Sequence, residues 1–85
     1  MAKYELSVRQ SVRKDVERIP RKDLTRILDK IEALRDDPRP PGCVKLSGRE
    51  YYRIRQGDYR IIYEVQDELL IIVLIKVGHR REVYK

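Results

Sequence analysis

Residues 49–63 read Arg49-Glu50-Tyr51-Tyr52-Arg53-Ile54-Arg55-Gln56-Gly57-Asp58-Tyr59-Arg60-Ile61-Ile62-Tyr63 and have the pattern of a β-hairpin. The pair Gly57-Asp58 suits a two-residue turn of type II′, which takes glycine at its first central position. In that register Arg55 lies opposite Arg60. Because side chains alternate along a strand, one face of the hairpin carries arginine and the other carries apolar bulk. The arginine face holds Tyr51, Arg53, Arg55 and Arg60, and the apolar face holds Tyr52, Ile54, Ile61 and Tyr63.

The pairing of Arg55 with Arg60 does not favour folding, because like charges directly opposed across two strands destabilise the pair. A polyanion bound between the two guanidinium groups would remove the repulsion, and this makes the arginine face the best indication of function in the chain. Two alternatives are open. Both side chains can point apart into water, and a three-residue turn would send Arg60 to the opposite face.

Length and charge limit what the chain can be. Its 85 residues are enough for one domain over residues 1–85, which would bury about 60–65 % of the surface that the unfolded chain exposes. Twenty Lys and Arg against fourteen Asp and Glu give a formal net charge of +6. Such an excess favours a phosphate-rich partner, although a membrane surface could use the same charge.

Several classes of protein are disfavoured. No run approaches the roughly 20 apolar residues of a membrane-spanning helix, and residues 1–5 lack the apolar region of a signal peptide. We therefore expect a cytoplasmic protein without a membrane partner. Cys43 is the single cysteine and His79 the single histidine, so neither an internal disulfide nor a Cys/His zinc cluster is available. No metal and no cofactor are predicted.

The first half of the chain has the pattern of one strand followed by two helices. Apolar residues alternate over residues 4–8, as in a short strand. They then follow helical spacing over residues 12–19, up to Pro20, and again over residues 24–34. The proline-rich segment 36–42 ends the second helix, because proline lacks the backbone donor and disfavours helical geometry in the residue before it.

The second half has the pattern of strands. Residues 43–46 form a possible short strand before the arginine hairpin. Residues 69–75 are apolar at every position, which favours a central strand covered on both faces, with the two helices as covers. The short polar connection 66–68 pairs this strand antiparallel with residues 59–65. We predict an α+β fold: an N-terminal strand, two helices and an antiparallel β-meander packed against the helices.

The order of these elements resembles a known family. Together with three sequence segments, this order resembles the RelE branch of the RelE/ParE superfamily of bacterial and archaeal toxins, over essentially the whole chain. The segments are Lys45-Leu46-Ser47-Gly48, residues 52–63 and the tail Val77-Gly78-His79-Arg80-Arg81-Glu82-Val83-Tyr84. The resemblance implies a RelE-like fold and a ribosome-dependent endoribonuclease that cuts messenger RNA in the decoding site. It also implies a small RelB-like antitoxin that holds the toxin inactive in a hetero-oligomer.

Site residues follow from the same resemblance. Arg53 and Arg55 match basic residues that contact RNA phosphates, and Arg60 matches an arginine used on the scissile phosphate. In the tail, Arg80 matches a second catalytic arginine and Tyr84 a tyrosine near the cleavage site. Some members of the family have lysine at the positions of Arg53 and Arg55, so this chain departs from a lysine-based scheme of proton transfer.

Four further residues have more than one reading each. His79 could move a proton, since an unperturbed imidazole has a pKa of about 6.5, or it could simply end a strand half-exposed. Tyr84 could move a proton, if cationic neighbours lowered its pKa from about 10, or stack on a displaced nucleotide; otherwise it could pack at the edge of the sheet. Lys45 and Arg81 could touch RNA or the ribosome, or could be solvated surface cations.

A rival function comes from the other branch of the superfamily. ParE-like proteins are expected to share the fold and to inhibit DNA gyrase by binding, without a nuclease site. The joint presence of Arg60, Arg80 and Tyr84 argues for the nuclease, because a binding-only protein has less need of them. A plain RNA-binding domain would explain the charge but not the tail.

Overall fold

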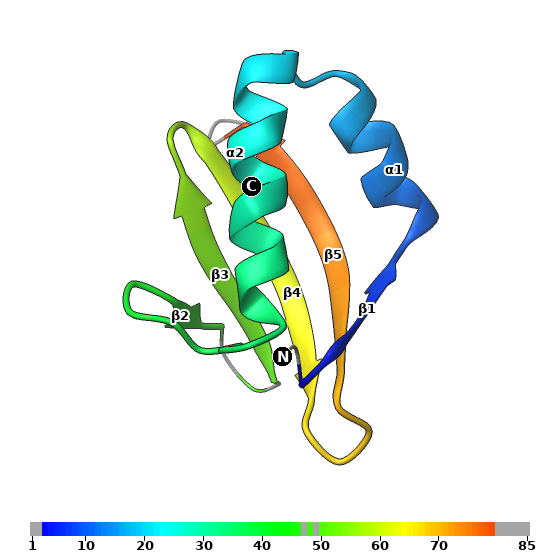
Figure 1. Ribbon diagram of the computed structural model, residues 1–85, viewed down its shortest axis with the longest axis vertical. Helices are drawn as coiled ribbons and strands as arrows, with labels where there is room; N and C mark the ends of the chain where they lie inside the picture. Colours follow the sequence, from blue (N-terminus) through cyan, green and yellow to red (C-terminus); the bar gives the residue numbers. More distant parts are fainter. Residues whose placement is uncertain (1–2, 47, 49, 80–85) are drawn as a thin grey trace.

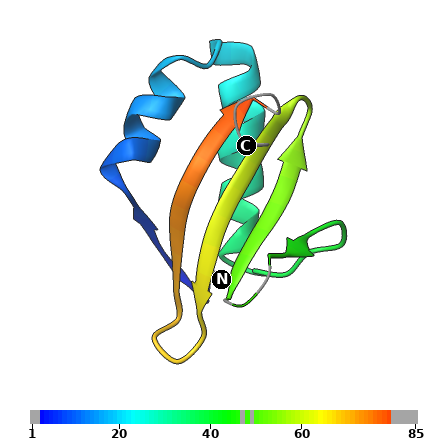
Figure 2. The same ribbon diagram turned by 180° about the vertical axis from the view of Figure 1, so that it is seen from behind.

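The computed structural model describes residues 3–46, 48 and 50–79. Within them a five-stranded mixed sheet carries two helices on one of its faces (Figures 1 and 2). In chain order the elements are β1 (Glu5–Val8), α1 (Gln10–Glu17), α2 (Arg21–Leu34), β2 (Val44–Lys45), β3 (Tyr51–Gln56), β4 (Tyr59–Gln66) and β5 (Ile71–His79). Across the sheet the strand order is β1-β5-β4-β3-β2.

The predicted α+β fold and its meander are confirmed. Strands β3, β4 and β5 are antiparallel neighbours, and β2 adds two residues to the outer edge of β3. β1 pairs parallel with β5, from Glu5 opposite Ile71 to Val8 opposite Leu74. A sequence pattern does not choose this partner for β1. A parallel pair needs a long crossover connection, which here includes both helices and the rest of the meander.

The hairpin has the predicted register. Arg55 lies opposite Arg60 and Tyr52 opposite Tyr63, with Gly57 at φ +61 and Asp58 outside the positive-φ region, as a type II′ turn requires. The two faces also separate as predicted, because every member of the apolar face is at most 5 % exposed. The two arginines do not both point into water, since Arg55 is exposed whereas Arg60 is 2 % exposed.

Both helices contribute to one core with the sheet. In α2, Ile27, Ile31 and Leu34 are at most 2 % exposed and follow the predicted spacing. Leu28 also belongs to the apolar pattern with helical spacing over residues 24–34 but is 50 % exposed, so the buried face of α2 is narrower than that pattern predicts. In α1, Val12 is buried and Val16 packs against the same core.

The prediction for the most apolar strand is wrong in two respects. Leu69 and Leu70 lie in the β4–β5 turn, 66 % and 48 % exposed, and β5 begins only at Ile71. Both helices lie on the same face of the sheet (Figures 1 and 2), so they do not cover β5 from both sides. β5 is nevertheless central, because β1 and β4 flank it.

An irregularity in β5 changes which of its residues face the core. Tyr63 of β4 lies opposite Leu74, but the preceding Ile62 lies opposite Lys76. Ile75 is therefore an extra residue, and such a bulge bends a strand and shifts its alternation. As a result Leu74 and Val77, three positions apart, are both buried in the core.

Candidate nucleic-acid interface

The arginine face lies on the side of the sheet away from the helices. Arg53 and Arg55 come from β3 and Arg60 comes from β4, on the face opposite to the buried Ile54 and Ile61. Directly opposed residues in an antiparallel pair have Cβ atoms about 4.5–5.5 Å apart. Arg55 and Arg60 therefore start from neighbouring positions on one face of the sheet, with Arg55 exposed and Arg60 buried.

The two arginines of the pair differ in burial, and this suits two different tasks. Arginine keeps its charge at any working pH and presents a rigid fork of N–H donors to phosphate. The exposed Arg55 can meet a phosphate at the surface, together with the half-buried Arg53. Arg60 is 2 % exposed, so its side chain is held by its surroundings, as a group that stabilises charge developing on a fixed atom should be.

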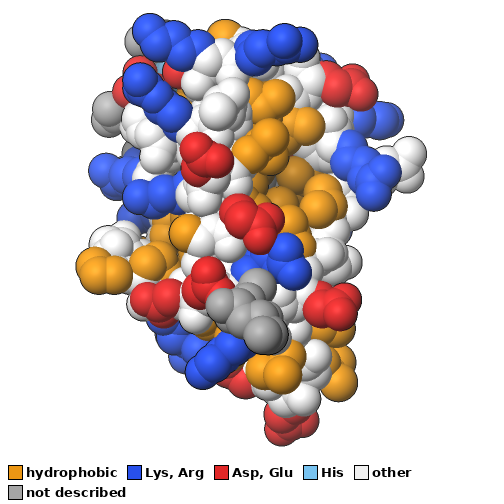
Figure 3. Space-filling view, in the orientation of Figure 1, with side chains coloured by type: hydrophobic (Ala, Val, Ile, Leu, Met, Phe, Trp, Pro, Cys, Tyr) orange, Lys and Arg blue, Asp and Glu red, His pale blue; other side chains and the backbone are white. Residues whose placement is uncertain are grey.

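The helix face differs in charge from the arginine face. It carries basic side chains around the end where α1 leads to α2, but acidic side chains lie among them and apolar side chains are visible between the helices (Figure 3). Arg18, Arg21 and Lys22 are the exposed cations near that end. The net positive charge of the chain is therefore spread over both faces.

His79 lies on the opposite face of the sheet from Arg60. It pairs with Tyr59 at the end of β5, and paired residues share a face, whereas Tyr59 and Arg60 are consecutive and point to opposite faces. The rings of His79 and Tyr59 meet edge to face at 5.6 Å. Both rings line a polar pocket of about 120 Å³. Asp15 of α1 and Arg18, directly after α1, line the same pocket. The fold does not gather His79 with the three arginines.

Lys45 is also separated from the arginine face. It pairs with Tyr52, and its Nζ lies 2.9 Å from Oε2 of Glu50. This hydrogen bond raises the pKa of Lys45 and contributes most to lowering the pKa of Glu50. Lys45 thus has a carboxylate partner. Arg80, Arg81 and Tyr84 fall outside the described residues, and their roles stay predictions.

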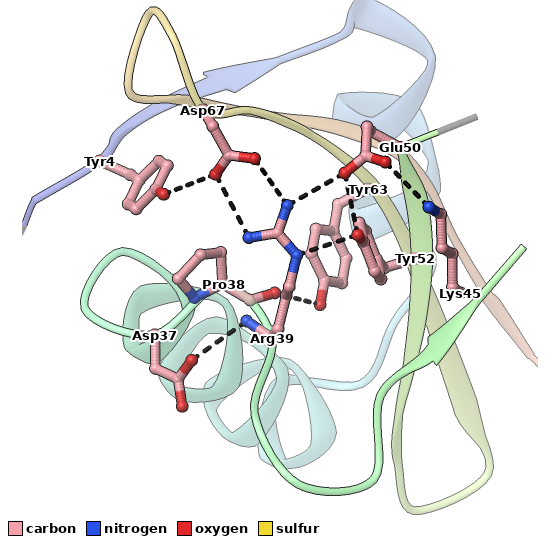
Figure 4. A network of polar contacts seen from close by, with 9 residues as sticks. All are labelled: Tyr4, Asp37, Pro38, Arg39, Lys45, Glu50, Tyr52, Tyr63 and Asp67. Carbon is pink, nitrogen blue, oxygen red and sulfur yellow. Dashed lines mark hydrogen bonds and ion pairs between the residues drawn. The ribbon is translucent and has the colours of Figure 1, made fainter.

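A polar network that the sequence did not indicate lies at the other end of the hairpin (Figure 4). At its centre is Arg39, from the proline-rich loop after α2. Its Nη1 and Nη2 donate to the two oxygens of Asp67 at 3.2 and 2.7 Å, and Nη2 also donates to Glu50 at 3.0 Å. Its Nε donates to the hydroxyl of Tyr52 at 2.9 Å. This single side chain connects the loop, the start of β3 and the β4–β5 turn.

Neighbouring tyrosines extend this network to the first strand and to the core. The hydroxyl of Tyr4 donates to Asp67 at 2.8 Å, which raises the pKa of Tyr4. The hydroxyl of Tyr63 donates to the carbonyl oxygen of Pro38 at 2.7 Å, and burial raises the pKa of Tyr63. The hydrogen bonds between Arg39 and Asp67 lower the pKa of Asp67 and raise the pKa of Arg39. Both cations, Arg39 and Lys45, have a carboxylate partner in Glu50 or Asp67, which indicates a structural role.

The described residues show neither a metal-binding cluster nor a membrane-spanning helix. Within them, no group of three or more His, Cys, Asp or Glu side chains is placed to hold a metal ion. No helix in the same part of the chain is long and apolar enough to cross a membrane.

Comparison with known proteins agrees with this architecture. Residues 6–84 match the family model of the ParE toxin of type II toxin-antitoxin systems, parDE. The putative toxin RelE1 of Methanocaldococcus jannaschii is 31 % identical over 87 residues, covering 98 % of this chain and 97 % of that protein. Toxin RelG of Mycobacterium tuberculosis is 27 % identical over 88 residues, covering 96 % and 97 %.

Solved structures give the same result. The archaeal RelE-RelB complex of Pyrococcus horikoshii contains a chain that superposes with a TM-score of 0.83 at 30 % identity, covering 92 % of this chain and 96 % of that one. A mutant of the Escherichia coli toxin RelE in the free state superposes with a TM-score of 0.80 at 26 % identity, covering 98 % and 88 %. The chain belongs to the RelE/ParE superfamily of type II toxin-antitoxin toxins, in its RelE branch.

Proposed function

We propose that this protein is a ribosome-dependent endoribonuclease that cleaves translated messenger RNA. The observation that carries the proposal is the cross-strand pair of Arg55 and Arg60 on the sheet face that the helices leave open. Two guanidinium side chains on directly opposed positions suit a phosphate between them, because its oxygens can accept charge-assisted hydrogen bonds from both. The whole of residues 1–85 would act as one toxin domain in the cytoplasm, where ribosomes are found.

The reaction proposed is attack by a ribose 2′-hydroxyl on the adjacent phosphate. The 2′-oxygen forms a bond to phosphorus while the bond from phosphorus to the 5′-oxygen of the next nucleotide breaks. A base takes the proton of the 2′-hydroxyl and an acid gives one to the leaving 5′-oxygen, so the products are a 2′,3′-cyclic phosphate and a 5′-hydroxyl. Charge on the phosphate oxygens rises in the transition state, where fixed donors stabilise it most. In this scheme Arg60 donates to the reacting phosphate, and Arg53 and Arg55 hold neighbouring phosphates.

Proton transfer needs groups other than these arginines, because a guanidinium does not lose its proton at working pH. His79 and Tyr84 are the two side chains predicted for this task. The position of His79 on the helix face favours its other reading, a half-exposed histidine at the end of a strand, with its ring edge-on to Tyr59. We therefore assign the proton transfer in this proposal to the tail, where Tyr84 is the candidate. Positioning of the reacting atoms by the ribosome would supply part of the rate, since orientation alone contributes several orders of magnitude.

A RelB-like antitoxin is the proposed partner that controls the activity. The solved relatives include RelE-RelB complexes from Pyrococcus horikoshii and Methanococcus jannaschii. A chain with a formal charge of +6 suits an acidic, partly disordered partner that wraps its surface. We infer a hetero-oligomer of toxin and antitoxin.

The test is cell-free translation of a defined messenger, with 5′ ends mapped by primer extension in the presence and absence of ribosomes. The wild type is expected to cut within codons only when ribosomes are present. Arg60→Ala should abolish these cuts. Arg55→Ala provides a second variant at an exposed position, and Arg26→Ala, exposed on α2, is the matched arginine control that should cut as the wild type does.

A second function has one observation in its favour, the match of residues 6–84 to the ParE toxin model. A ParE-like inhibitor would leave the messenger intact and would instead inhibit supercoiling by purified DNA gyrase. Folded protein that behaves in this way would replace the nuclease proposal.

A further inference from the structure

The end of β5 is held in place by a residue of α1. β1 pairs with β5 only as far as Val8 opposite Leu74, so within the described residues the later part of β5 has no strand partner on that side. Asp15, in the last turn of α1, occupies this position. Its Oδ2 accepts a hydrogen bond from the backbone N–H of Val77 at 3.3 Å, and its Oδ1 accepts one from Nζ of Lys76 at 3.2 Å. The side chain of Asp15 is 18 % exposed.

The segment that Asp15 holds is the one beside Arg60. After the bulge at Ile75, Val77 lies opposite Ile61 and Gly78 lies opposite Arg60. Because the bulge shifts the register, the placement of Gly78 is not set by the regular pairing of β4 and β5 in the lower half of the sheet. It depends on what fixes β5 beyond the bulge, which on the inner side is the renewed pairing with β4 from Ile62 opposite Lys76 to Tyr59 opposite His79. On the outer side of β5 the fixed point in the described structure is the carboxylate of Asp15.

The two elements that Asp15 connects, α1 and β5, are both packed in the core near this contact. On the helix side, Val12 and Val16 anchor α1 in the core, with Val12 only 1 % exposed. On the strand side, Val77 is 1 % exposed. Asp15 makes one hydrogen bond to the backbone and one ion pair, so both of its oxygens are used. A carboxylate in this arrangement links the end of a strand to a helix that is packed against the core.

We propose that Asp15 is a positioning residue that holds the end of β5 beside Arg60 in the geometry that RNA cleavage requires. The inference rests on the proposed nuclease function and adds a residue of α1 to it. Asp15 touches no substrate in this scheme and acts only through β5. Small displacements of a catalytic constellation reduce its rate steeply, because the transition state is matched to fixed positions.

The experiment compares rates of messenger cleavage at saturating ribosomes for four proteins. Asp15→Ala removes both contacts and should lower the maximal rate by on the order of 10-fold, with little change in the ribosome concentration that gives half of that rate. Asp15→Asn keeps a side-chain oxygen for the N–H of Val77 and should recover most of the rate. Lys76→Met removes the ion pair alone and should stay close to the wild type.

A structural control separates positioning from loss of stability. Arg39→Met disrupts the network at the other end of the hairpin and should lower the melting temperature without lowering the cleavage rate. In a ¹H–¹⁵N NMR spectrum, Asp15→Ala should also shift the amide signal of Gly78, whereas Arg39→Met should not. This readout does not depend on cleavage.

Each outcome is decisive. The proposal is overturned if Asp15→Ala cuts at the wild-type rate, if Asp15→Asn is as slow as Asp15→Ala, or if Asp15→Ala and Arg39→Met are slowed in proportion to their loss of melting temperature. Wild-type protein that leaves the messenger intact overturns the nuclease proposal together with this inference. A wild type that cuts, beside an unaffected Asp15→Ala, overturns this inference alone.

Discussion

The two ends of the β3–β4 hairpin differ in the charge of the side chains that they place next to an arginine. Near the β4–β5 turn, Arg39 is surrounded by partners that suit it: two carboxylates, a tyrosine hydroxyl and the Tyr52 ring, 5.1 Å from its guanidinium carbon. Near the Gly57-Asp58 turn, the cross-strand neighbour of Arg60 is another arginine. The first arrangement stabilises the fold. The second places two like charges on directly opposed positions, a pairing that by itself does not favour folding.

The largest effect is expected at the arginine face, from the conservative change Arg60→Lys. Lysine keeps the positive charge but loses the planar fork of donors, so the rate of ribosome-dependent cleavage should fall on the order of 100-fold. The measurement is the initial rate of messenger cleavage at saturating ribosomes. Far-ultraviolet circular dichroism should show an unchanged fold. A variant that cuts as fast as the wild type would mean that charge alone matters at this position.

The next effect is expected at the opposite end. Arg39→Met removes the hydrogen bonds that connect the proline-rich loop, β3 and the β4–β5 turn, so the melting temperature should fall by on the order of 5 °C. Cleavage at a temperature where the variant is folded should not change. Lys45→Met, which breaks a single exposed ion pair with Glu50, is the matched control and should cost less stability. Equal losses of melting temperature for the two variants would mean that Arg39 contributes no more to stability than Lys45 does.

The pH dependence of stability should sharpen the same contrast. The pKa values of Asp67 and Glu50 are lowered in the folded protein. Groups with a depressed pKa stabilise the fold above their unfolded values, about 3.9 for Asp and 4.3 for Glu, and this stabilisation is lost as the pH falls through the folded values. The wild type should therefore lose melting temperature steeply below about pH 4. Arg39→Met should lose less over the same range, as measured by thermal unfolding between pH 7 and pH 3.

The smallest effect should have the opposite sign. Arg55→Thr removes one of two opposed cations and introduces a residue that suits strands. The melting temperature should therefore rise by about 2 °C, while affinity for ribosome-bound messenger falls. The control is Arg26→Thr on α2, which should lower the melting temperature slightly because threonine is a poorer helix former. An Arg55→Thr variant with reduced stability would show that the pair does not oppose folding.

Short-range features were open to prediction from the sequence. The register of the hairpin follows from Gly57, because a two-residue turn with positive φ at its first position leaves one way to pair the flanking strands. The buried positions of α2 follow from the spacing of Ile27, Ile31 and Leu34. Continuous apolar composition was a poorer guide, since Leu69 and Leu70 read as strand but lie in an exposed turn.

The sequence by itself determined the α+β class, the hairpin register and the separation of its arginine face from its apolar face, because these depend on residues a few positions apart. Only the tertiary structure decided that β1 pairs with β5, that His79 lies on the opposite face from Arg60, and that Arg39 and Asp15 connect distant elements. Contacts between residues 28 or 62 positions apart, such as Arg39 with Asp67 and Asp15 with Val77, leave no periodic signal. They form because packing of the core brings their elements together, and the polar groups near its edge then take the partners that this packing leaves within reach.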